Sequence, residues 1–177
     1  AWDQEERIPR LGRDVLHSDD PLTTHYLRCT LIGAVRRVFH PGTKMDTLPV
    51  LTGPQGAMKS TFWMTLVGRE WFSDSPIDLD SKDGQMVLHR KWCTELAEID
   101  HLTSTKAAER IKAFLSSSED VFRPPFGRTV VAFERSCFLV GTANRDGFLV
   151  DPTGSRRFWP ISCGETLDLK RLEAWRT

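Results

Sequence analysis

Nine residues constrain this chain more than any others, because they combine a glycine-rich backbone with a lysine and two hydroxyl groups. They follow a short apolar run over 48–51 and precede a segment rich in helix formers, and they read Gly53-Pro54-Gln55-Gly56-Ala57-Met58-Lys59-Ser60-Thr61. A strand, a glycine-rich turn and a helix N-terminus in this order are typical of a phosphate-binding loop. Backbone N–H groups of such a loop wrap the β-phosphate, the lysine bridges the β- and γ-phosphates, and the serine hydroxyl ligates Mg²⁺. The sequence therefore predicts a nucleoside triphosphate site.

The loop departs from the usual pattern at one position. Met58 stands where glycine normally precedes the lysine. A side chain there can crowd the loop or the neighbouring helix. Because the phosphate cradle uses backbone N–H groups, this substitution does not by itself abolish binding.

Composition narrows the class of protein. The 177 residues carry 24 lysines and arginines against 24 aspartates and glutamates, so any contact with nucleic acid must be local. No apolar run approaches the length of a membrane span and no signal peptide opens the chain, so we expect no membrane partner and a cytoplasmic location. The cysteines are scattered without a CxxC pair, which argues against a zinc site and a disulfide framework; they are Cys29, Cys93, Cys137 and Cys163.

Periodicity and turn signals predict alternating helices and strands. Apolar residues recur in steps of three and four from Leu22 to Phe39, after a helix start at Asp19 or Asp20 with Pro21. Residues 1–20 are polar and are expected to be irregular. Further helices are expected over 59–67, 83–90 and 105–115, and strands near 48–52, 129–133, 137–141 and 157–161. This alternation favours an α/β fold with a mainly parallel sheet.

Hydrolysis would need a carboxylate that steers Mg²⁺ and polarises water. The candidates are Glu95 and Glu98 in the apolar stretch 92–99. A carboxylate at the C-terminal end of a core strand lies beside a phosphate loop in such sheets. Glu98 lies nearer the expected strand end, so we favour it as the water-polarising or metal-steering group with Ser60, and Glu95 as a second carboxylate that shares the metal role.

Three polar residues further along the chain are candidates for contacts with the reacting phosphate. Asn144 ends an apolar strand, where an amide can hold the attacking water or contact the γ-phosphate. Arg156 and Arg157 stand between a turn and a strand, where an arginine can stabilise the transferring phosphoryl group, including one bound to a neighbouring subunit. The alternative is an ordinary turn asparagine and two solvated arginines.

Further short motifs occur in a fixed order around the loop. They are Trp2-Asp3, Pro9-Arg10-Leu11, Ala34-Val35-Arg36-Arg37-Val38, Pro41-Gly42, Ser81-Lys82-Asp83, Glu95-Leu96-Ala97-Glu98, Ile111-Lys112-Ala113-Phe114, Phe122-Arg123-Pro124-Pro125-Phe126-Gly127-Arg128, Gly141-Thr142-Ala143-Asn144 and Thr153-Gly154-Ser155-Arg156-Arg157-Phe158-Trp159-Pro160. Together they cover nearly the whole chain. In this order they resemble the virulence-associated E (VapE) family of phage and genomic-island replication proteins.

That family resembles the superfamily 3 helicases, which have an AAA+ core. The resemblance therefore implies a P-loop NTPase of the AAA+ type, with a three-layer α/β core and a mainly parallel central sheet, preceded by a helical N-terminal segment. It implies ATP and Mg²⁺ as ligands, and a motor that couples ATP hydrolysis to unwinding or translocation on DNA, often beside a primase domain. Such motors work as rings, usually hexamers, with ATP between subunits and single-stranded DNA in a central channel.

The resemblance also implies roles for individual residues. By matching motif, residues 53–61 are the Walker A loop, Glu95 and Glu98 are the Walker B carboxylates, and Asn144 is the sensor residue. Arg156 or Arg157 resembles the arginine finger, and we prefer Arg157 because it directly precedes the Phe-Trp-Pro strand.

The segment from Lys112 through Arg128 resembles the part of these motors that faces DNA in the channel. Its candidate contacts are the cations Lys112, Arg123 and Arg128, although the acidic residues between them make the signal weak by charge alone.

We expect two regions in the chain, a helical segment over 1–45 packed on a P-loop ATPase core over 46–177, with the family's usual C-terminal continuation missing. The leading expectation is a helicase-type motor for replication of a phage or genomic island in a bacterial cell. Two other functions stay open, a nucleotide-binding replication initiator or interaction module with little hydrolysis, and a P-loop nucleotide or small-molecule kinase. A kinase would need a lid and an acceptor pocket, and no arginine-rich lid signature stands out.

Overall fold

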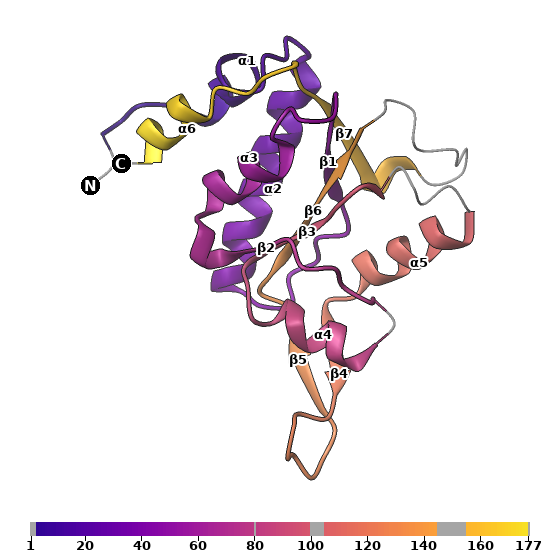
Figure 1. Cartoon of the computed structure of the whole chain (residues 1–177). Helices are drawn as coiled ribbons and strands as arrows, with labels where there is room; N and C mark the ends of the chain where they lie inside the picture. Colours follow the sequence, from indigo (N-terminus) through magenta and orange to yellow (C-terminus); the bar gives the residue numbers. More distant parts are fainter. Residues whose placement is uncertain (1–2, 80, 100–104, 145–154, 177) are drawn as a thin grey trace.

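A five-stranded sheet forms the centre of the molecule (Figure 1). The computed structural model describes residues 3–79, 81–99, 105–144 and 155–176. Along the sheet the strands follow the order β2-β3-β6-β1-β7, and each described pairing is parallel. The expected mainly parallel α/β architecture is confirmed. The strands are β1 (Leu48–Thr52), β2 (Phe72–Ser73), β3 (Cys93–Leu96), β6 (Phe138–Ala143) and β7 (Phe158–Ser162).

Strand β1 lies between β6 and β7 and is fully buried, as its near-continuous apolar sequence predicts. It tolerates Pro49, which has no N–H to donate, because the pairing with β6 begins only at Val50. Thr52 pairs with Ala143 of β6 and with Ser162 of β7. The residues that follow these three strands therefore emerge side by side at one edge of the sheet.

Helices cover both faces of the sheet (Figure 1). On one face lie α1 (Leu11–Asp14), α2 (Pro21–Phe39), α3 (Lys59–Val67) and α6 (Leu169–Arg176). On the other lie α4 (Lys82–Leu88) and α5 (Thr105–Ser116). Helix α2 begins as predicted, because the Asp20 carboxylate accepts a hydrogen bond of 2.9 Å from the Leu22 N–H. Among the described residues, no helix has the length and apolar character needed to cross a bilayer.

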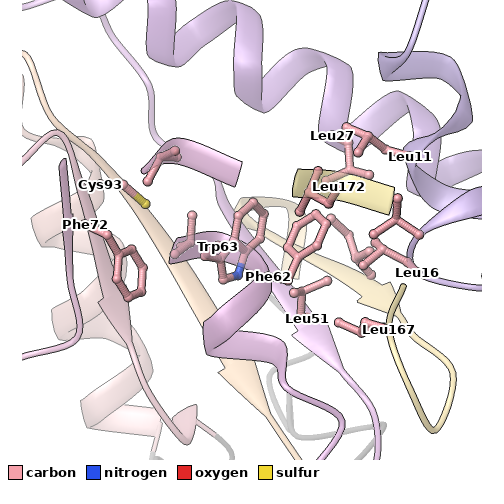
Figure 2. Packing of buried hydrophobic residues seen from close by; sticks show 14 of the residues in the cluster. Leu11, Leu16, Leu27, Leu51, Phe62, Trp63, Phe72, Cys93, Leu167 and Leu172 are labelled. Carbon is pink, nitrogen blue, oxygen red and sulfur yellow. The ribbon is translucent and has the colours of Figure 1, made fainter. Parts of the chain in front are cut away.

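The N-terminal segment packs against the sheet through a shared hydrophobic core (Figure 2). Phe62 and Trp63 of α3 are fully buried at its centre. They lie among leucines from distant parts of the chain, namely Leu11, Leu16, Leu27, Leu51, Leu167 and Leu172. Residues before position 45 therefore belong to the same core as β1 and α3. Burial of each large side chain in this core contributes roughly 1.5–3 kcal/mol.

Residues 3–20 are more regular than their polar sequence predicts. They form a 3-10 turn, η1 (Ile8–Arg10), and the short helix α1. The Val15 and Leu16 N–H groups both donate to the Leu11 carbonyl at 3.1 Å, which closes α1 over the core. The expectation of an irregular segment was wrong here because tertiary packing of Leu11, Val15 and Leu16 outweighs local composition.

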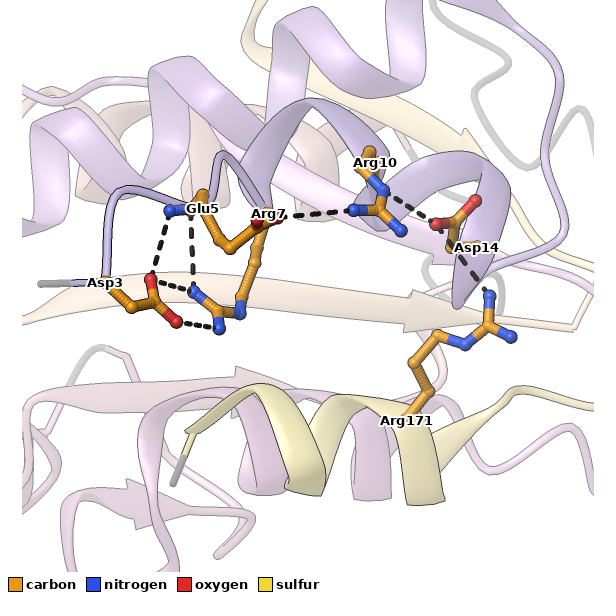
Figure 3. Close-up of polar contacts among 6 residues, drawn as sticks. All are labelled: Asp3, Glu5, Arg7, Arg10, Asp14 and Arg171. Carbon is orange, nitrogen blue, oxygen red and sulfur yellow. Dashed lines mark hydrogen bonds and ion pairs between the residues drawn. The ribbon is translucent and has the colours of Figure 1, made fainter.

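Surface ion pairs hold this segment near the C-terminal helix (Figure 3). Asp3 pairs with Arg7, and this bond lowers the pKa of the Asp3 carboxyl well below its ordinary value. The Asp14 carboxylate accepts from Arg10 at 3.0 Å and lies 3.8 Å from Arg171 of α6. Ion pairs at the surface are screened by water and contribute little to stability, so the buried core supplies most of the stability of this region.

A two-stranded antiparallel hairpin, β4 (Glu119–Phe122) with β5 (Val131–Glu134), projects away from the sheet (Figure 1). At its base the Arg135 guanidinium donates to the buried Asp120 carboxylate at 2.6 Å and 2.8 Å, and His89 Nε2 lies 3.0 Å from the same group. Burial alone raises the pKa of Asp120, but these hydrogen bonds outweigh it and lower the pKa. Phe122 and Phe133 stack with ring centroids 4.4 Å apart. The hairpin therefore has a rigid base.

Candidate functional site

The β1–α3 loop, residues 53–58, lies at the edge of the sheet where β1, β6 and β7 end. Lys59 opens α3 and is 7% exposed. Its Nζ donates to the Gly53 and Pro54 carbonyl oxygens, each at 2.9 Å, and to Asn144 Oδ1 at 3.1 Å. The predicted lysine and the predicted asparagine, 85 positions apart in the sequence, therefore meet at one point because β1 and β6 are neighbouring parallel strands.

The N-terminus of α3 faces this loop without a side-chain cap. Met58, at the N-cap position, has a left-handed backbone with φ of 62°. Gly56 also has positive φ, 85°, and a Cβ added there would meet no heavy atom within 4 Å. The first N–H groups of a helix attract anions, and a loop with open space above it gives access to them.

The Met58 side chain does not crowd this loop, because it is 44% exposed. The departure from the usual glycine is instead one of backbone conformation, since the left-handed region is the one that glycine adopts at lowest cost. The lysine and the serine that follow keep helical positions in α3.

A buried carboxylate from β3 reaches the first turn of α3. Glu95 is 2% exposed, and its Oε1 accepts hydrogen bonds from Ser60 Oγ at 2.7 Å and from Thr142 Oγ1 of β6 at 2.6 Å. The other oxygen, Oε2, is buried with no hydrogen-bond partner among the described residues. A buried carboxylate oxygen is costly unless a cation or a donor reaches it.

These groups suit Mg²⁺ better than Zn²⁺. Mg²⁺ is usually bound through one or two carboxylates together with substrate phosphates and water, whereas Zn²⁺ takes three or four His, Cys or carboxylate ligands. Ser60 and Glu95 provide one hydroxyl and one carboxylate. Within the described ranges, no group of three or more His, Cys, Asp or Glu residues is placed to hold a metal ion.

Glu98 lies beyond the end of β3, in an exposed turn with φ of 51°. It lines the same cleft as Glu95, a hollow of about 490 Å³ between α5 and the segment 74–79. The contact with Ser60, which the sequence assigned first to Glu98, is made by Glu95. Both glutamates thus line the cleft, but the buried Glu95 contacts the serine whereas Glu98 lies in the exposed turn.

Arg156 and Arg157 lie in η4 (Ser155–Arg157), directly before β7. Because β7 runs parallel to β1, they stand at the end of the sheet opposite the β1–α3 loop. The five residues of β7 separate them from that loop by about 16 Å of strand. Arg157 Nε lies 3.8 Å from Asp46 Oδ2, just before β1, whereas Arg156 is exposed. Neither arginine meets the loop of its own chain.

The three candidate cations for nucleic acid lie in two places. Arg123 and Arg128 are exposed and flank the tip of the β4–β5 hairpin, while Lys112 is half-buried on α5. Between the two arginines stands Phe126, whose side chain is fully exposed on a backbone with φ of 63°. The sequence prediction for this segment named only its cations as contacts and missed Phe126; an aromatic residue between a Pro-Pro pair and a glycine was the available signal.

The model of the virulence-associated protein E-like domain matches residues 1–177. The chain belongs to this family. Its fold is similar to that of solved structures of the C-terminal region of NrS-1. Three apo structures superpose with TM-scores of 0.58, 0.66 and 0.63 at 18%, 16% and 16% identity. They cover 93–98% of this chain, which spans 38–44% of those chains. No curated protein sequence matches it.

Proposed function

We propose that this VapE-like domain is a P-loop ATPase of the AAA+ type, part of a helicase or translocase that replicates a phage or genomic island. One observation carries this proposal, the meeting of Lys59 with Asn144 and of Ser60 with Glu95 around the uncapped start of α3. These are the groups that bind and cleave a nucleoside triphosphate in P-loop enzymes. The replication role rests on the family and on the likeness to the NrS-1 region.

In this proposal the α3 N-terminus and the loop N–H groups hold the β-phosphate of ATP. Lys59 exchanges the Gly53 and Pro54 carbonyl oxygens for phosphate oxygens, a short movement for an ammonium that already lies across the loop. Asn144 keeps the lysine oriented from the side of β6. Mg²⁺, when bound, neutralises charge on the phosphate oxygens, and Ser60 with Glu95 would hold it.

Glu95 also organises the neighbouring hydroxyl groups. Its Oε1 accepts from both Ser60 and Thr142, which leaves the buried Oε2 to accept from water or to meet a cation. Glu98, in the exposed turn at the cleft, would accept the proton of the attacking water. We therefore assign Glu95 to the metal side of the reaction and Glu98 to the water side.

The arginine that completes the site would come from a second subunit. Arg156 is exposed at the far end of the sheet, about 16 Å of strand from its own loop. Packing of one subunit head to tail on the next would bring it to the neighbour's phosphates, as in a ring that closes by rotation, with six copies as the expected number. Arg157 is the less favoured candidate because it faces Asp46 of its own chain.

Single-stranded DNA is the proposed partner of the hairpin tip. Arg123 and Arg128 can contact phosphates, and the exposed Phe126 ring can stack on a base. The buried Asp120–Arg135 pair holds the base of the hairpin, so force applied at the tip is transmitted to the sheet.

Steady-state ATP hydrolysis with and without single-stranded DNA tests the proposal. Lys59→Ala is expected to lower turnover by at least about 100-fold, because it removes the charge that faces the phosphates. Glu95→Gln is expected to retain ATP binding through the loop and Lys59 but to lose hydrolysis by a similar factor, because it removes the carboxylate proposed to hold Mg²⁺. Lys170→Ala, an exposed lysine on α6, is the matched control and should hydrolyse ATP at the unaltered rate.

The alternatives predict other results. Binding of ATP with negligible turnover, even with DNA, would support a nucleotide-binding initiator or interaction module. The cleft of about 490 Å³ beside Glu95 and Glu98 gives room for an acceptor and is the observation that favours a kinase. Turnover that appears only when a phosphoryl acceptor is added would assign the site to that reaction. DNA-stimulated hydrolysis that survives Lys59→Ala would refute the proposed site.

A further inference from the structure

An apolar groove opens at the end of the sheet opposite the β1–α3 loop, and its function is not explained by nucleotide chemistry. We define the Trp71 groove by the residues that line it, which are Val35, Val38, Phe39, Val67, Trp71, His89, Arg90, Lys91, Trp92 and Ser136. Its volume is about 650 Å³. It lies between the C-terminal half of α2 and the segments that lead into β2 and β3.

Four large apolar side chains on the walls of the groove are exposed to solvent. Phe39 is 74% exposed, Trp71 54%, Val38 50% and Val35 47%. Three of these four come from one helix at steps of three and four residues, so α2 presents a second apolar stripe besides the one that faces the core. Contiguous apolar surface of this kind marks an interaction site in soluble proteins.

The groove is fixed before anything binds to it. The Trp92 Nε1–H group donates to the Ala34 carbonyl at 3.3 Å, and the Trp92 backbone N–H donates to the Trp71 carbonyl at 3.0 Å. Lys91 Nζ donates to the Glu70 carbonyl at 2.7 Å. The groove residues would therefore lose little conformational entropy when a partner binds, and preorganised surfaces bind more tightly for that reason.

The charge of the lining selects the partner. Arg90 and Lys91 lie on the rim beside the two tryptophans, and among the described residues that line the groove none carries a carboxylate. The walls are aliphatic and aromatic, with cations on one side only. We propose that the Trp71 groove binds an amphipathic helical segment of a partner protein, with apolar residues facing the groove and acidic residues facing Arg90 and Lys91.

The test uses two fluorescently labelled helical peptides with the same leucines at i, i+4 and i+7. One carries glutamates on its other faces and the second carries lysines at the same positions. Fluorescence anisotropy with the 177-residue chain should show the acidic peptide binding about tenfold or more tightly than the basic one, because like charges oppose the second peptide. Equal affinity of the two, or binding of neither, would overturn the proposal.

Variants locate the binding on the groove. Phe39→Ala removes the most exposed wall and is expected to weaken binding of the acidic peptide about tenfold without loss of fold, since the ring is largely outside the core. Arg90→Glu is expected to reduce or reverse the preference between the peptides. Leu22→Ala, 52% exposed at the other end of α2, is the control and should bind as the parent does.

Two other occupants would give distinct outcomes. Displacement of the acidic peptide by rising concentrations of the unlabelled chain, with a dimer seen by light scattering, would assign the groove to a second copy. Quenching of tryptophan emission by single-stranded DNA that Phe39→Ala abolishes would assign it to nucleic acid. Either result would overturn an acidic protein partner.

Discussion

Met58 offers a direct test of how the β1–α3 loop is built. Its backbone lies in the left-handed region, with φ of 62°, and its side chain is 44% exposed. Two substitutions separate the contribution of the backbone from that of the side chain. Met58→Ala removes the side chain beyond Cβ but retains the conformational cost, whereas Met58→Gly removes both. The difference in stability between the two variants therefore measures the cost of a Cβ at this φ.

The magnitude follows from two opposing terms. A residue with a Cβ in the left-handed region costs about 1–2 kcal/mol. Glycine loses more backbone entropy on folding, which offsets roughly 0.5–1 kcal/mol of that gain. We therefore expect Met58→Gly to be more stable to unfolding than Met58→Ala by about 0.5–1 kcal/mol, or roughly 1–4 °C in Tm for a chain of this length.

Urea unfolding followed by tryptophan emission gives the free energies, since Trp63 is fully buried and reports the loss of the core. The neighbouring substitution Ala57→Gly is the matched control. Ala57 is buried and does not have positive φ, so glycine there should lower stability. If Met58→Ala proved as stable as Met58→Gly, the left-handed conformation of this loop in solution would be refuted.

Three further predictions concern packing and ionisation. Gly53→Ala should weaken nucleotide binding and lower Tm, because its Cβ would lie 2.7 Å from Cys163 Sγ; calorimetry and nucleotide titration check this, and an unchanged Tm would contradict it. The folded-state pKa of Asp120 lies below its ordinary 3.8, so its contribution to stability is complete above pH 3.8 and is lost as the pH falls through the folded value. Urea unfolding over this range should show that slope, and Asp120→Asn, which removes the carboxylate facing Arg135, should flatten it. Burial raises the pKa of the Cys93 thiol, so iodoacetamide followed by mass spectrometry should label Cys93 far more slowly than the half-buried Cys163, and equal rates would contradict its burial.

The elements around the candidate site could be predicted from the sequence to within a residue or two. The helix over 21–39, the strand over 48–52 and the helix over 59–67 are where their capping and periodicity indicate. Strong local signals made this possible, an Asp-Pro start for the first helix and a continuous apolar run for the strand. Because a helix follows a glycine-rich phosphate loop directly, the position of the loop also predicted where α3 begins.

Other elements lack such signals. Strand β4 contains Glu119 and Asp120, which favour a loop by composition, and its pairing with β5 depends on the distant contact of Asp120 with Arg135 and His89. Helix α6 has no apolar periodicity strong enough to indicate it and is held by core packing of Leu172. The turn expected just before Arg156 and Arg157, over residues 151–154, lies outside the described residues.

The sequence likewise predicted one part of the candidate site and not the other. The sequence named Lys59, Ser60, Glu95 and Asn144 as candidates, and these four side chains lie together because strand ends in a parallel sheet share an edge. The sequence could not show which of the two glutamates contacts Ser60. The residue pattern does not say which of two carboxylates three positions apart faces α3. Thr142, the second donor to Glu95, lies in the Gly141-Thr142-Ala143-Asn144 motif, but only its register in β6 shows that its hydroxyl faces Glu95.

The two outer strands of the sheet set a limit on how copies of this chain can join. One outer strand, β2, has only two residues, and the other, β7, contains Pro160, which contributes no N–H to an added strand. Short and proline-containing edges are poor templates for backbone pairing between molecules. At this sheet, contacts between copies are therefore expected to be made by side chains and loops, which can separate and re-form. A sheet that cannot grow also lowers the tendency of the chain to form fibrils at the high local concentrations that assembly requires.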